Sequence, residues 1–498
     1  MCAMTIPSEW IHNTGALRGV ERSVVKDLSS AQDTLMERAG QAGAWHVQRL
    51  YPLARHVVVV VGPGNNGGDG LISARVLREA GLAVTVLAPR GAPATLAARA
   101  AVMAFGESFG GATLDALKTA DVIVDALLGI GLNRDVEPDL AAVIRAMNEA
   151  TCPVLSLDVP SGLDADTGHV CGVAVRADHT LSFLGLKTGF YLGQGPAYTG
   201  HIVLASLDIP DAYWRDVPAG LARITPHAVQ SLLPRRERML HKTLAGRVLV
   251  VAGGPGMPGA ARLTGEACLR AGAGRVVIAT AAVHAPVISI GCPELIVMGI
   301  TQPHEVLPLL AEADVIVMGP GLGRSAWATQ LLSVLWTAPQ PLIVDADALN
   351  ALAVTGHRRS NWCLTPHAGE AARLLGCSAR AIQEERLQSV NALVTRYGGV
   401  VVLKGPSTLI AAEGLSVPMV CERGNPGMAT AGMGDVLCGV IAAIAAQQAL
   451  PAQTLALSAA IGVDVHARAA DMAAGTLERG LIARDVIAHL RACVNPLC

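Results

Sequence analysis

The feature that most constrains this chain is a unit that recurs along it: a short apolar run, a glycine-rich loop, and then a segment of helical character. In the first half, Val57–Val61 is followed by Gly62–Gly70 and then by Leu71–Ala80. Runs of Val, Ile and Leu without polar alternation are typical of strands that are covered on both faces. Strands that alternate with helices predict parallel sheets with right-handed crossovers. We therefore expect an α/β fold.

The expected strands form two groups. Those of the first half continue with Ala83–Ala88, Asp121–Ala126, Val154–Leu157 and His201–Leu207. Those of the second half are Arg247–Val251, Val276–Ala279, Val315–Met318, Leu342–Val344 and Val400–Leu403. A chain of 498 residues exceeds the usual size of one hydrophobic core, so we expect two domains. The mixed stretch Pro210–Pro234 holds the expected boundary, which divides the chain into residues 1–222 and 223–498.

Composition excludes several classes of function. Hydrophobic residues make up 51% and charged residues 16% of the chain, which argues against disorder. A net charge of −2 and 3% aromatic residues predict no nucleic-acid partner and no membrane partner. The longest apolar stretch, near Val436–Ala446, is too short to span a bilayer. With 11 scattered Cys and no apparent signal peptide, we expect reduced, mostly buried thiols and a cytoplasmic location.

Three polar segments of the first half each follow an expected strand. The loop Gly62–Gly70 offers backbone amides to a phosphate, and the side chains of Asn65, Asn66 and Asp69 to a ribose, an amide or an ion. The other two segments, residues 125–134 and 158–164, each begin with an Asp. Such an Asp is often only a helix N-cap, but strand ends of an open parallel sheet meet at one edge, where ligands bind. We expect the three segments to converge there.

Two further features belong to the same expected edge. Asn66, Asp125 and Ser161 supply oxygen atoms of the kind that a hard cation prefers. Lys187 leaves two alternatives open, a surface charge or a phosphate contact.

The most informative segment of the second half is Asn425–Asp435, a loop that precedes an expected apolar helix, Val436–Ala446. Backbone amides from Gly432 to Asp435 would point at an anion from the helix N-terminus. Such a nest stabilises charge on a transferring phosphoryl group, and Asp435 can accept the proton of an attacking hydroxyl. The alternative is that Asp435 only caps the helix, but capping does not require the preceding glycines.

Other polar residues of the second half also follow expected strands. Lys404 can pair with a nucleotide phosphate, or it is a surface lysine. His367 precedes a helix with Glu370 placed for its first turn, and it either serves the site or is a satisfied structural histidine. Asp347 is either a helix cap or a residue near a metal. No P-loop, zinc-spaced Cys/His set or nucleophile elbow occurs, so we expect phosphoryl transfer between a nucleotide and a hydroxyl without a covalent enzyme nucleophile.

Taken in order, these motifs resemble those of a known family. The first half is similar to NAD(P)HX epimerases in Leu35–Gly40, Asn65–Asp69, Asp125–Arg134 and Asp158–Gly162. The second half is similar to ADP-dependent (S)-NAD(P)HX dehydratases in His241-Lys242, Gly253–Ala260, Gly319–Gly323, Asp345–Asn350, Thr365–Glu370, Lys404–Thr408 and Asn425–Asp435. Together the halves resemble bifunctional NAD(P)H-hydrate repair enzymes. The resemblance implies a Rossmann-like three-layer sandwich followed by a ribokinase-like three-layer sandwich.

The resemblance also implies a two-step repair of NADHX and NADPHX, which carry a hydroxyl on the nicotinamide ring. The N-terminal domain would interconvert the R and S epimers with potassium bound. The C-terminal domain would dehydrate the S form with ADP and magnesium, and release AMP and phosphate. Asp435 would take the proton of the ring hydroxyl, and loss of phosphate would restore the double bond. Small molecules are thus the expected partners, and we expect a homo-oligomer.

The resemblance assigns residues to each site. In the epimerase domain, Asp158 would be catalytic, and the residues in contact with the hydrated cofactor would be Asn65, Asn66, Gly67, Gly68, Asp69, Gly129, Ile130, Gly131, Leu132, Asn133, Arg134, Asp135 and Asp158. Potassium would be held by Asn66, Asp125 and Ser161. In the dehydratase domain, the hydrated cofactor would contact Ala260, Gly321 or Gly323, His367 and the catalytic Asp435. The adenine nucleotide would contact Lys404, Gly405, Pro406, Ser407, Thr408 and Gly434.

One departure from the family pattern is visible. Residues 431–435 read Ala-Gly-Met-Gly-Asp, where many relatives have Gly-Gly-Thr-Gly-Asp. We expect the chemistry to be unchanged because Gly432, Gly434 and Asp435 are kept. The side chains of Ala431 and Met433 would instead alter the nucleotide preference or the metal contact. Two alternatives remain open at this point. The chain is an ATP-dependent ribokinase-like kinase of small molecules, or its N-terminal half is a non-catalytic binding module.

Overall fold

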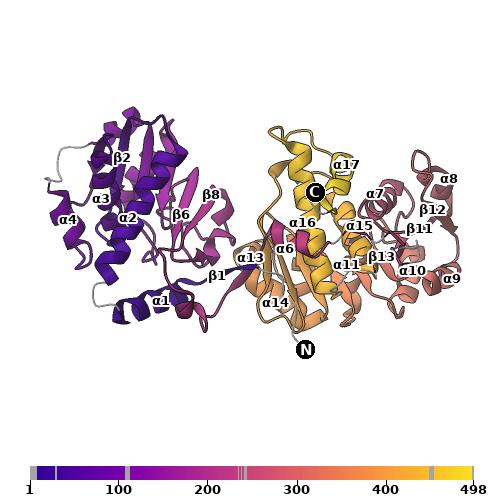
Figure 1. The fold of residues 1–498 in the computed structure, drawn as a ribbon. Helices are drawn as coiled ribbons and strands as arrows, with labels where there is room; N and C mark the ends of the chain where they lie inside the picture. The colour runs from indigo at the N-terminus through magenta and orange to yellow at the C-terminus, as the bar shows by residue number, and fades with distance from the viewer. Residues whose placement is uncertain are drawn as a thin grey trace. The chain divides into compact units, whose positions relative to one another are not determined.

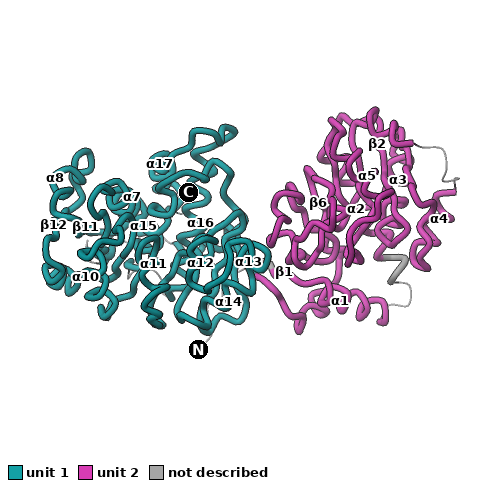
Figure 2. The backbone as a smooth tube through the Cα atoms, turned by 180° about the vertical axis from the view of Figure 1, so that it is seen from behind, with its two compact units in different colours: residues 1–9, 222–498 teal, residues 10–221 magenta. Residues whose placement is uncertain are grey.

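A computed structural model of the chain describes residues 8–27, 31–106, 113–233, 235–236, 238–239, 244–447 and 454–495. The motif residues His241 and Lys242 lie outside these ranges. Within the ranges, no helix is both long enough and apolar enough to cross a membrane. Two compact units make up the chain, one of residues 10–221 and the other of residues 1–9 and 222–498 (Figures 1 and 2).

The N-terminal unit is built on a parallel sheet with the strand order β3-β2-β4-β5-β6-β8. Its strands are β2 (His56–Val61), β3 (Ala83–Leu87), β4 (Val122–Ala126), β5 (Val154–Leu157), β6 (His179–Phe183) and β8 (His201–Ala205), and a short parallel pair joins β1 (Ser8–His12) to β7 (Leu186–Lys187). Its helices are α1 (Thr14–Asp27), α2 (Ala31–Leu50), α3 (Asn65–Glu79), α4 (Arg99–Phe105) and α5 (Pro138–Glu149), with 3-10 turns η1 (Leu114–Thr119), η2 (Thr188–Phe190), η3 (Gly195–Ala197) and η4 (Asp211–Trp214). Because β3 and β4 lie on opposite sides of β2, the carboxyl ends of β2 and β4 flank a topological switch point, where such sheets bind ligands.

Helices cover both faces of this sheet, as the continuous apolar strands predict. Val57, Val59 and Val61 of β2 belong to one core with residues of α2 and α3. Val58 and Val60 belong to another core with residues of α5 and η1. The N-terminal half is therefore a Rossmann-like three-layer sandwich, and the predicted fold class is confirmed.

The glycine-rich loop after β2 is shorter than predicted, because α3 already begins at Asn65. Gly67 and Gly70 lie inside this helix, where glycine is ordinarily unfavourable. A methyl group on Gly67 would lie 2.0 Å from the carbonyl oxygen of Gly62, and one on Gly70 would lie 2.6 Å from Cβ of Ala126. These glycines therefore let α3 pack closely on the sheet, and the prediction that they form a loop was wrong.

The C-terminal unit is built on strands β10 (Arg247–Val251), β11 (Arg275–Ala281), β12 (Ile296–Ile300), β13 (Val315–Met318), β14 (Leu342–Val344), β15 (Trp362–Leu364), β16 (Val400–Leu403), β17 (Thr408–Ala412) and β18 (Met419–Cys421), with β9 (Leu221–Ile224) at the junction. Its helices are α6 (Pro226–Ser231), α7 (Pro258–Arg270), α8 (Ala285–Ile288), α9 (Leu307–Glu312), α10 (Ala326–Leu335), α11 (Ala346–Thr355), α12 (Ala368–Leu375), α13 (Ala379–Glu384), α14 (Arg386–Tyr397), α15 (Met433–Ala446), α16 (Leu455–Ala474) and α17 (Ala483–Cys493), with 3-10 turns η5 (Ala282–His284), η6 (Pro303–Val306) and η7 (Pro426–Met428).

The strands of this unit follow the order β12-β11-β10-β13-β14-β15-β16-β17-β18-β9. All neighbours from β12 to β16 are parallel, whereas β17 is antiparallel to both of its neighbours. The carboxyl ends of β10, β13, β14, β15 and β16 therefore follow one another along a single edge. The predicted site segments of the second half lie along that edge.

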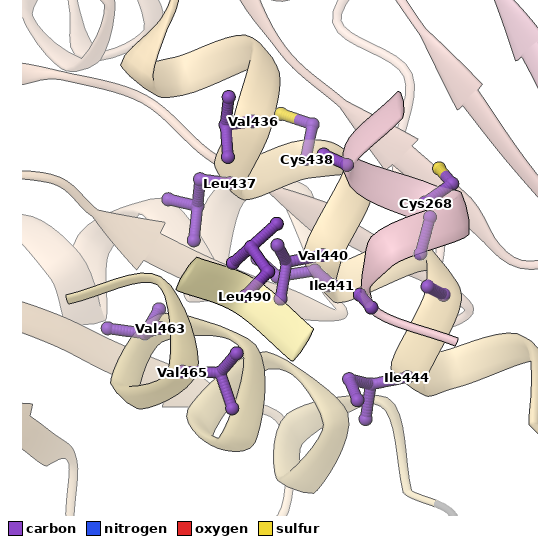
Figure 3. Close-up of a cluster of buried hydrophobic side chains, with 14 of the residues drawn as sticks. Cys268, Val436, Leu437, Cys438, Val440, Ile441, Ile444, Val463, Val465 and Leu490 are labelled. Atoms are coloured by element: carbon purple, nitrogen blue, oxygen red, sulfur yellow. The ribbon is translucent and has the colours of Figure 1, made fainter. Parts of the chain in front are cut away.

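Helix α15 lies in a large hydrophobic core of this unit (Figure 3). It packs against Cys268 of α7, Val463 of α16 and Leu490 of α17, as well as strand residues. On the other face, α12 packs on both α11 and α14, and α14 contacts β16 and β17. The ribokinase-like three-layer arrangement is thus confirmed. The predicted apolar helix is also present, although it begins three residues earlier than expected, at Met433.

Candidate active sites

The N-terminal unit contains a cavity of about 560 Å³ at the carboxyl edge of its sheet. The segments after β2, β4 and β5 line it with Asn65, Asp69, Gly129–Asp135 and Asp158. The predicted convergence of the three polar segments is therefore confirmed. A cavity of this volume is large enough for a small-molecule ligand or a large part of a cofactor.

An ion pair between Asp158 and Lys187 faces this cavity. Lys187 is 1% exposed, and its Nζ lies 2.5 Å from Oδ1 of Asp158. The same Nζ donates hydrogen bonds to Oγ of Ser182 at 2.9 Å and to the carbonyl oxygen of Phe183 at 3.0 Å. Burial lowers the pKa of Lys187, and the charge of Asp158 opposes that shift. The alternative of a surface lysine was wrong.

The predicted cation ligands meet in a buried network. Asp125 accepts hydrogen bonds from Oγ of Ser161 at 2.5 Å and from Oγ of Ser156 at 2.8 Å. Burial raises the pKa of Asp125, and these hydrogen bonds lower it in part. Nδ2 of Asn66 donates to the carbonyl oxygens of Leu128 and Leu157 at 2.9 and 3.1 Å, which fixes the orientation of its amide. Oδ1 of Asn66 is buried and has no hydrogen-bond partner among the described residues.

In the C-terminal unit, the candidate site centres on an ion pair that the sequence did not suggest. Nζ of Lys404, at the end of β16, lies 2.8 Å from Oδ1 of Asp345, which follows β14. Thr365 donates to the same oxygen at 2.8 Å, and Glu370 lies 3.8 Å from the ammonium group. A methyl group on Gly434 would lie 3.3 Å from both Asp345 and Lys404. Lys404 is thus not a free surface lysine, and the glycine nest lies against this pair.

Asp435 lies in the first turn of α15, directly beyond this nest. Gly432 is the N-cap residue with a φ of 91°, a left-handed conformation that favours glycine. Among the described residues, none donates a hydrogen bond to the Asp435 carboxylate, so the helix-cap alternative is wrong. Burial and the charge of Asp345 raise the pKa of Asp435 to about 7, while Lys404 opposes the shift. A carboxylate of this kind can act as a general base near neutral pH.

The structure also bears on Met433, which departs from the family pattern, and on His367. Met433 is buried in the core, so this change from the family pattern alters packing rather than the lining of the nest. Nδ1 of His367 accepts hydrogen bonds from the amides of Gly369 and Glu370 at 2.9 and 3.2 Å, which confirms its structural alternative. Its side chain is still 55% exposed, so a contact with substrate stays a prediction.

The loops around α7 approach each other closely. Oδ2 of Asp347 accepts a hydrogen bond from the amide of Gly323 at 2.8 Å, so Asp347 holds this loop instead of only capping α11. A methyl group on Gly321 would lie 2.9 Å from Cβ of Ala260. Gly321 and Ala260 therefore lie against each other, whereas a contact of Ala260, Gly321 or Gly323 with the hydrated cofactor stays a prediction.

Arg386 hydrogen-bonds to the backbone of the segment Lys404–Thr408, which is predicted to contact the nucleotide. This arginine is 4% exposed, and its Nη2 donates to the carbonyl oxygens of Leu403 and Ser407, both at 3.0 Å. Burial lowers the pKa of Arg386 to about 10, so the side chain remains charged at neutral pH. Sequence patterns did not single out Arg386, which belongs to no recognisable loop signature. They placed Asp345 at the start of the motif Asp345–Asn350 but gave it no role of its own.

Comparison with known proteins decides the family. The NAD(P)H-hydrate dehydratase family matches residues 248–491, and the family described as YjeF-related protein N-terminus matches residues 32–189. The bifunctional NAD(P)H-hydrate repair enzyme of Coxiella burnetii is 42% identical to this chain, and the match covers 98% of the chain and 99% of that enzyme. The chain belongs to the bifunctional NAD(P)H-hydrate repair enzymes. It therefore combines epimerase and dehydratase activities, and the alternatives of a kinase and of a binding module are not favoured.

Other relatives agree with this family. The repair enzyme of Escherichia coli is 39% identical over 96% of this chain and 93% of its own length. That of Thermofilum pendens is 35% identical over 93% and 91%, respectively. Among solved structures, a ribokinase-like superfamily protein of Enterococcus faecalis is 28% identical with a TM-score of 0.50 and covers 55% of this chain and 95% of its own. That protein matches about half of the chain, in keeping with the ribokinase-like fold of the C-terminal unit.

Proposed function

We propose that Asp435 is the general base of ADP-dependent dehydration. Asp435 takes the proton of the ring hydroxyl of (S)-NAD(P)HX, and the oxygen attacks the terminal phosphorus of ADP. An O–P bond forms as the bond between phosphorus and the AMP oxygen breaks. Phosphate then leaves the ring carbon, the adjacent carbon loses a proton, and the double bond of NAD(P)H returns. The observation that carries this proposal is the position of the Asp435 carboxyl group in the first turn of α15, directly after the glycine nest that lies against Asp345 and Lys404.

The residues around Asp435 have separate tasks in this proposal. Amides at the start of α15 stabilise the charge of the moving phosphoryl group. Lys404 and the segment that Arg386 holds contact the nucleotide. Magnesium would neutralise the phosphate charge. The described residues contain no group of three His, Cys, Asp or Glu that could hold a metal ion, which fits a magnesium ion carried mainly by the phosphates and water.

For the epimerase we propose that Asp158 contacts the hydrated ring and transfers a proton. It lines the cavity together with Lys187, with which it forms an ion pair. Potassium fits the buried network of Asn66, Asp125 and Ser161, because Oδ1 of Asn66 is buried without a partner among the described residues. Nδ2 of Asn66 and Oγ of Ser161 both donate to the carbonyl oxygen of Leu128, and Ser161 also donates to Asp125. A bound cation would help to order the strand-end segments that line the cavity. The homo-oligomeric state stays a prediction.

The substitution Asn66→Ala is expected to abolish potassium binding. Wild-type protein should unfold at a temperature a few degrees higher in potassium chloride than in choline chloride, because a ligand of the native state adds about 2.7 kcal/mol at 100 times its Kd. The variant should show no such difference, since the unpaired Oδ1 is gone. Thermal unfolding in the two salts measures this directly, with Asn148→Ala as the matched control. An equal potassium shift in Asn66→Ala would contradict the assignment.

The repair function itself is tested with hydrated NADH as substrate. The purified chain, magnesium and potassium are mixed with an R and S mixture and either ADP or ATP, and the recovery of NADH absorbance is followed. We expect full recovery with ADP, since both epimers reach the S form. Absence of recovery with either nucleotide would overturn the proposal. Recovery with ATP but not ADP would contradict ADP as the co-substrate.

A further inference from the structure

A second carboxyl group of the epimerase cavity lies on α1. Glu21 lines the same cavity as Asp158, although no motif contains it. The start of α1 is fixed, because the amide and Oγ1 of Thr14 donate hydrogen bonds to Asp166 at 2.6 and 2.7 Å. The helix therefore presents Glu21 to the cavity from a fixed position.

The same helix is tied to the cavity wall one turn before Glu21. Nη2 of Arg18 donates a hydrogen bond to the carbonyl oxygen of Ile130 at 2.9 Å, and Ile130 lines the cavity. Leu17, which directly precedes Arg18 in α1, is 1% exposed and anchors the helix in the interior. Glu21 therefore lines the cavity from a helix that hydrogen bonds hold in place.

The charges around Glu21 differ from those around Asp158. Asp158 accepts a hydrogen bond from the ammonium group of Lys187. Among the described residues, the Glu21 carboxyl group forms no ion pair and no hydrogen bond. Burial and the charge of Asp158 raise the pKa of Glu21, and Arg18 and Arg22 oppose the shift. Glu21 consequently keeps a proton to higher pH than an exposed glutamate does.

A third carboxyl group, that of Asp69, also lines the epimerase cavity. Asp69 lines the cavity from α3, and its pKa is raised well above the usual range by burial and by the charges of Asp158 and Glu21. The cavity therefore combines Asp158, which is ion-paired with a lysine, with two carboxyl groups whose pKa values are raised by burial. Environments that separate the pKa values of neighbouring acids mark out acid and base roles.

Epimerisation of the hydrated ring requires both roles. Water adds to an enamine with its hydroxyl on the carbon next to nitrogen, so the hydroxyl-bearing carbon is bonded to the ring nitrogen. When the C–O bond breaks, both electrons go to oxygen, and the lone pair of nitrogen forms a C=N bond. Water that adds from the opposite face gives the other epimer. The departing oxygen needs one proton, and the entering water must lose one.

We propose that Glu21 is a second catalytic residue of the epimerase, which donates a proton to the departing hydroxyl while Asp158 accepts one from the entering water. The hydroxyl leaves as water, Glu21 becomes a carboxylate, and Asp158 becomes protonated. In the opposite direction the two residues exchange roles, and solvent restores their starting states. This assignment rests on the proposed role of Asp158.

The test compares Glu21→Gln with the wild-type enzyme on the separate epimers. Gln keeps the shape of the side chain but cannot donate an acidic proton. With (R)-NADHX and ADP, we expect the variant to recover NADH at least about 100-fold more slowly, as for loss of a general acid. With (S)-NADHX, the dehydration rate should be unchanged, which also shows that the protein is folded. Glu79→Gln, at an exposed end of α3, is the matched control.

Isotopic oxygen tests the bond that breaks. In water labelled with oxygen-18 and without ADP, each inversion by the wild-type enzyme should place one solvent oxygen in the ring hydroxyl. The Glu21→Gln variant should lose this incorporation, and Glu21→Asp, which keeps the acid, should retain part of it. Inversion without incorporation, Glu21→Asp no better than Glu21→Gln, or a wild-type rate in Glu21→Gln would overturn the role of Glu21.

A parallel measurement separates this inference from the proposed epimerase site. If Asp158→Asn loses inversion and Glu21→Gln does not, only the role of Glu21 fails. If both variants invert (R)-NADHX at the wild-type rate, the proposed site in this cavity fails.

Discussion

Replacement of Asp435 by Asn is expected to abolish dehydration of (S)-NAD(P)HX. Asn has the shape of Asp but cannot accept the hydroxyl proton, so kcat should fall by about 10²–10⁴-fold. The fold should survive, because the Asp435 carboxylate receives no hydrogen bond among the described residues and lies at the partly open start of α15. ADP should still bind, since the nest is built from backbone amides. Thermal unfolding with and without ADP measures this binding separately from turnover.

The pH dependence gives this prediction a second measurement. Asp435 must be deprotonated to act as a base, and its pKa is raised to about 7. Below that pH, the fraction of carboxylate falls, so kcat/KM for the S form should fall about tenfold for each pH unit. Above it, kcat/KM should level off. Asp435→Asn should lose this limb of the profile.

A matched control separates chemistry from helix capping. Asp485 also lies in the first turn of a helix of the same unit, where it accepts a hydrogen bond from the amide of Ile482 at 3.0 Å. Asp485→Asn should change stability by no more than about 1 kcal/mol and leave kcat unchanged. Turnover of Asp435→Asn within tenfold of the wild type, or an unaltered pH profile, would refute the role of Asp435 as the base.

Much of the fold followed from the sequence because its strands are buried on both faces. Val154–Leu157, Arg247–Val251 and Val400–Leu403 begin and end where the apolar runs predict. Their carboxyl ends carry the site segments, so alignment of parallel strands brought Asp125 and Ser161 together without further information. An unbroken run of apolar residues is a local property of the chain, so the sequence alone could reveal these strands.

Residues that act through partners distant in sequence were not predictable in this way. Asp345 was predicted only as the first residue of the motif Asp345–Asn350, without a role of its own. In the structure it binds Lys404, which lies far along the chain, and its charge contributes to the raised pKa of Asp435. Lys187 was undecided for the same reason, since only the fold buries it against Asp158. Glycines in α3 misled the prediction in another way. Their role is close packing against the sheet, which depends on atoms of other segments.

Replacement of Asp158 is expected to abolish epimerisation while ADP-dependent dehydration of the S form continues. Asp158→Ala should achieve this but at a cost in stability. It leaves the buried Lys187 ammonium without its partner, and loss of one member of a buried ion pair costs about 3–5 kcal/mol. Asp158 also has a φ of 65°, a conformation that Asn and Asp tolerate better than Ala does.

Asp158→Asn is therefore the more decisive variant. Its amide oxygen can still accept a hydrogen bond from Lys187, and Asn adopts the required backbone conformation, so the unit should remain folded. It cannot accept a proton as a carboxylate does, so inversion of (R)-NADHX should fall by about 10²–10⁴-fold. Recovery of NADH from (S)-NADHX with ADP should match the wild type, because the dehydration residues belong to the other compact unit. Inversion of (R)-NADHX by Asp158→Asn at the wild-type rate would show that the cavity does not house this chemistry. Equal loss on both epimers would instead show that Asp158 serves the stability of the chain and not the epimerase step.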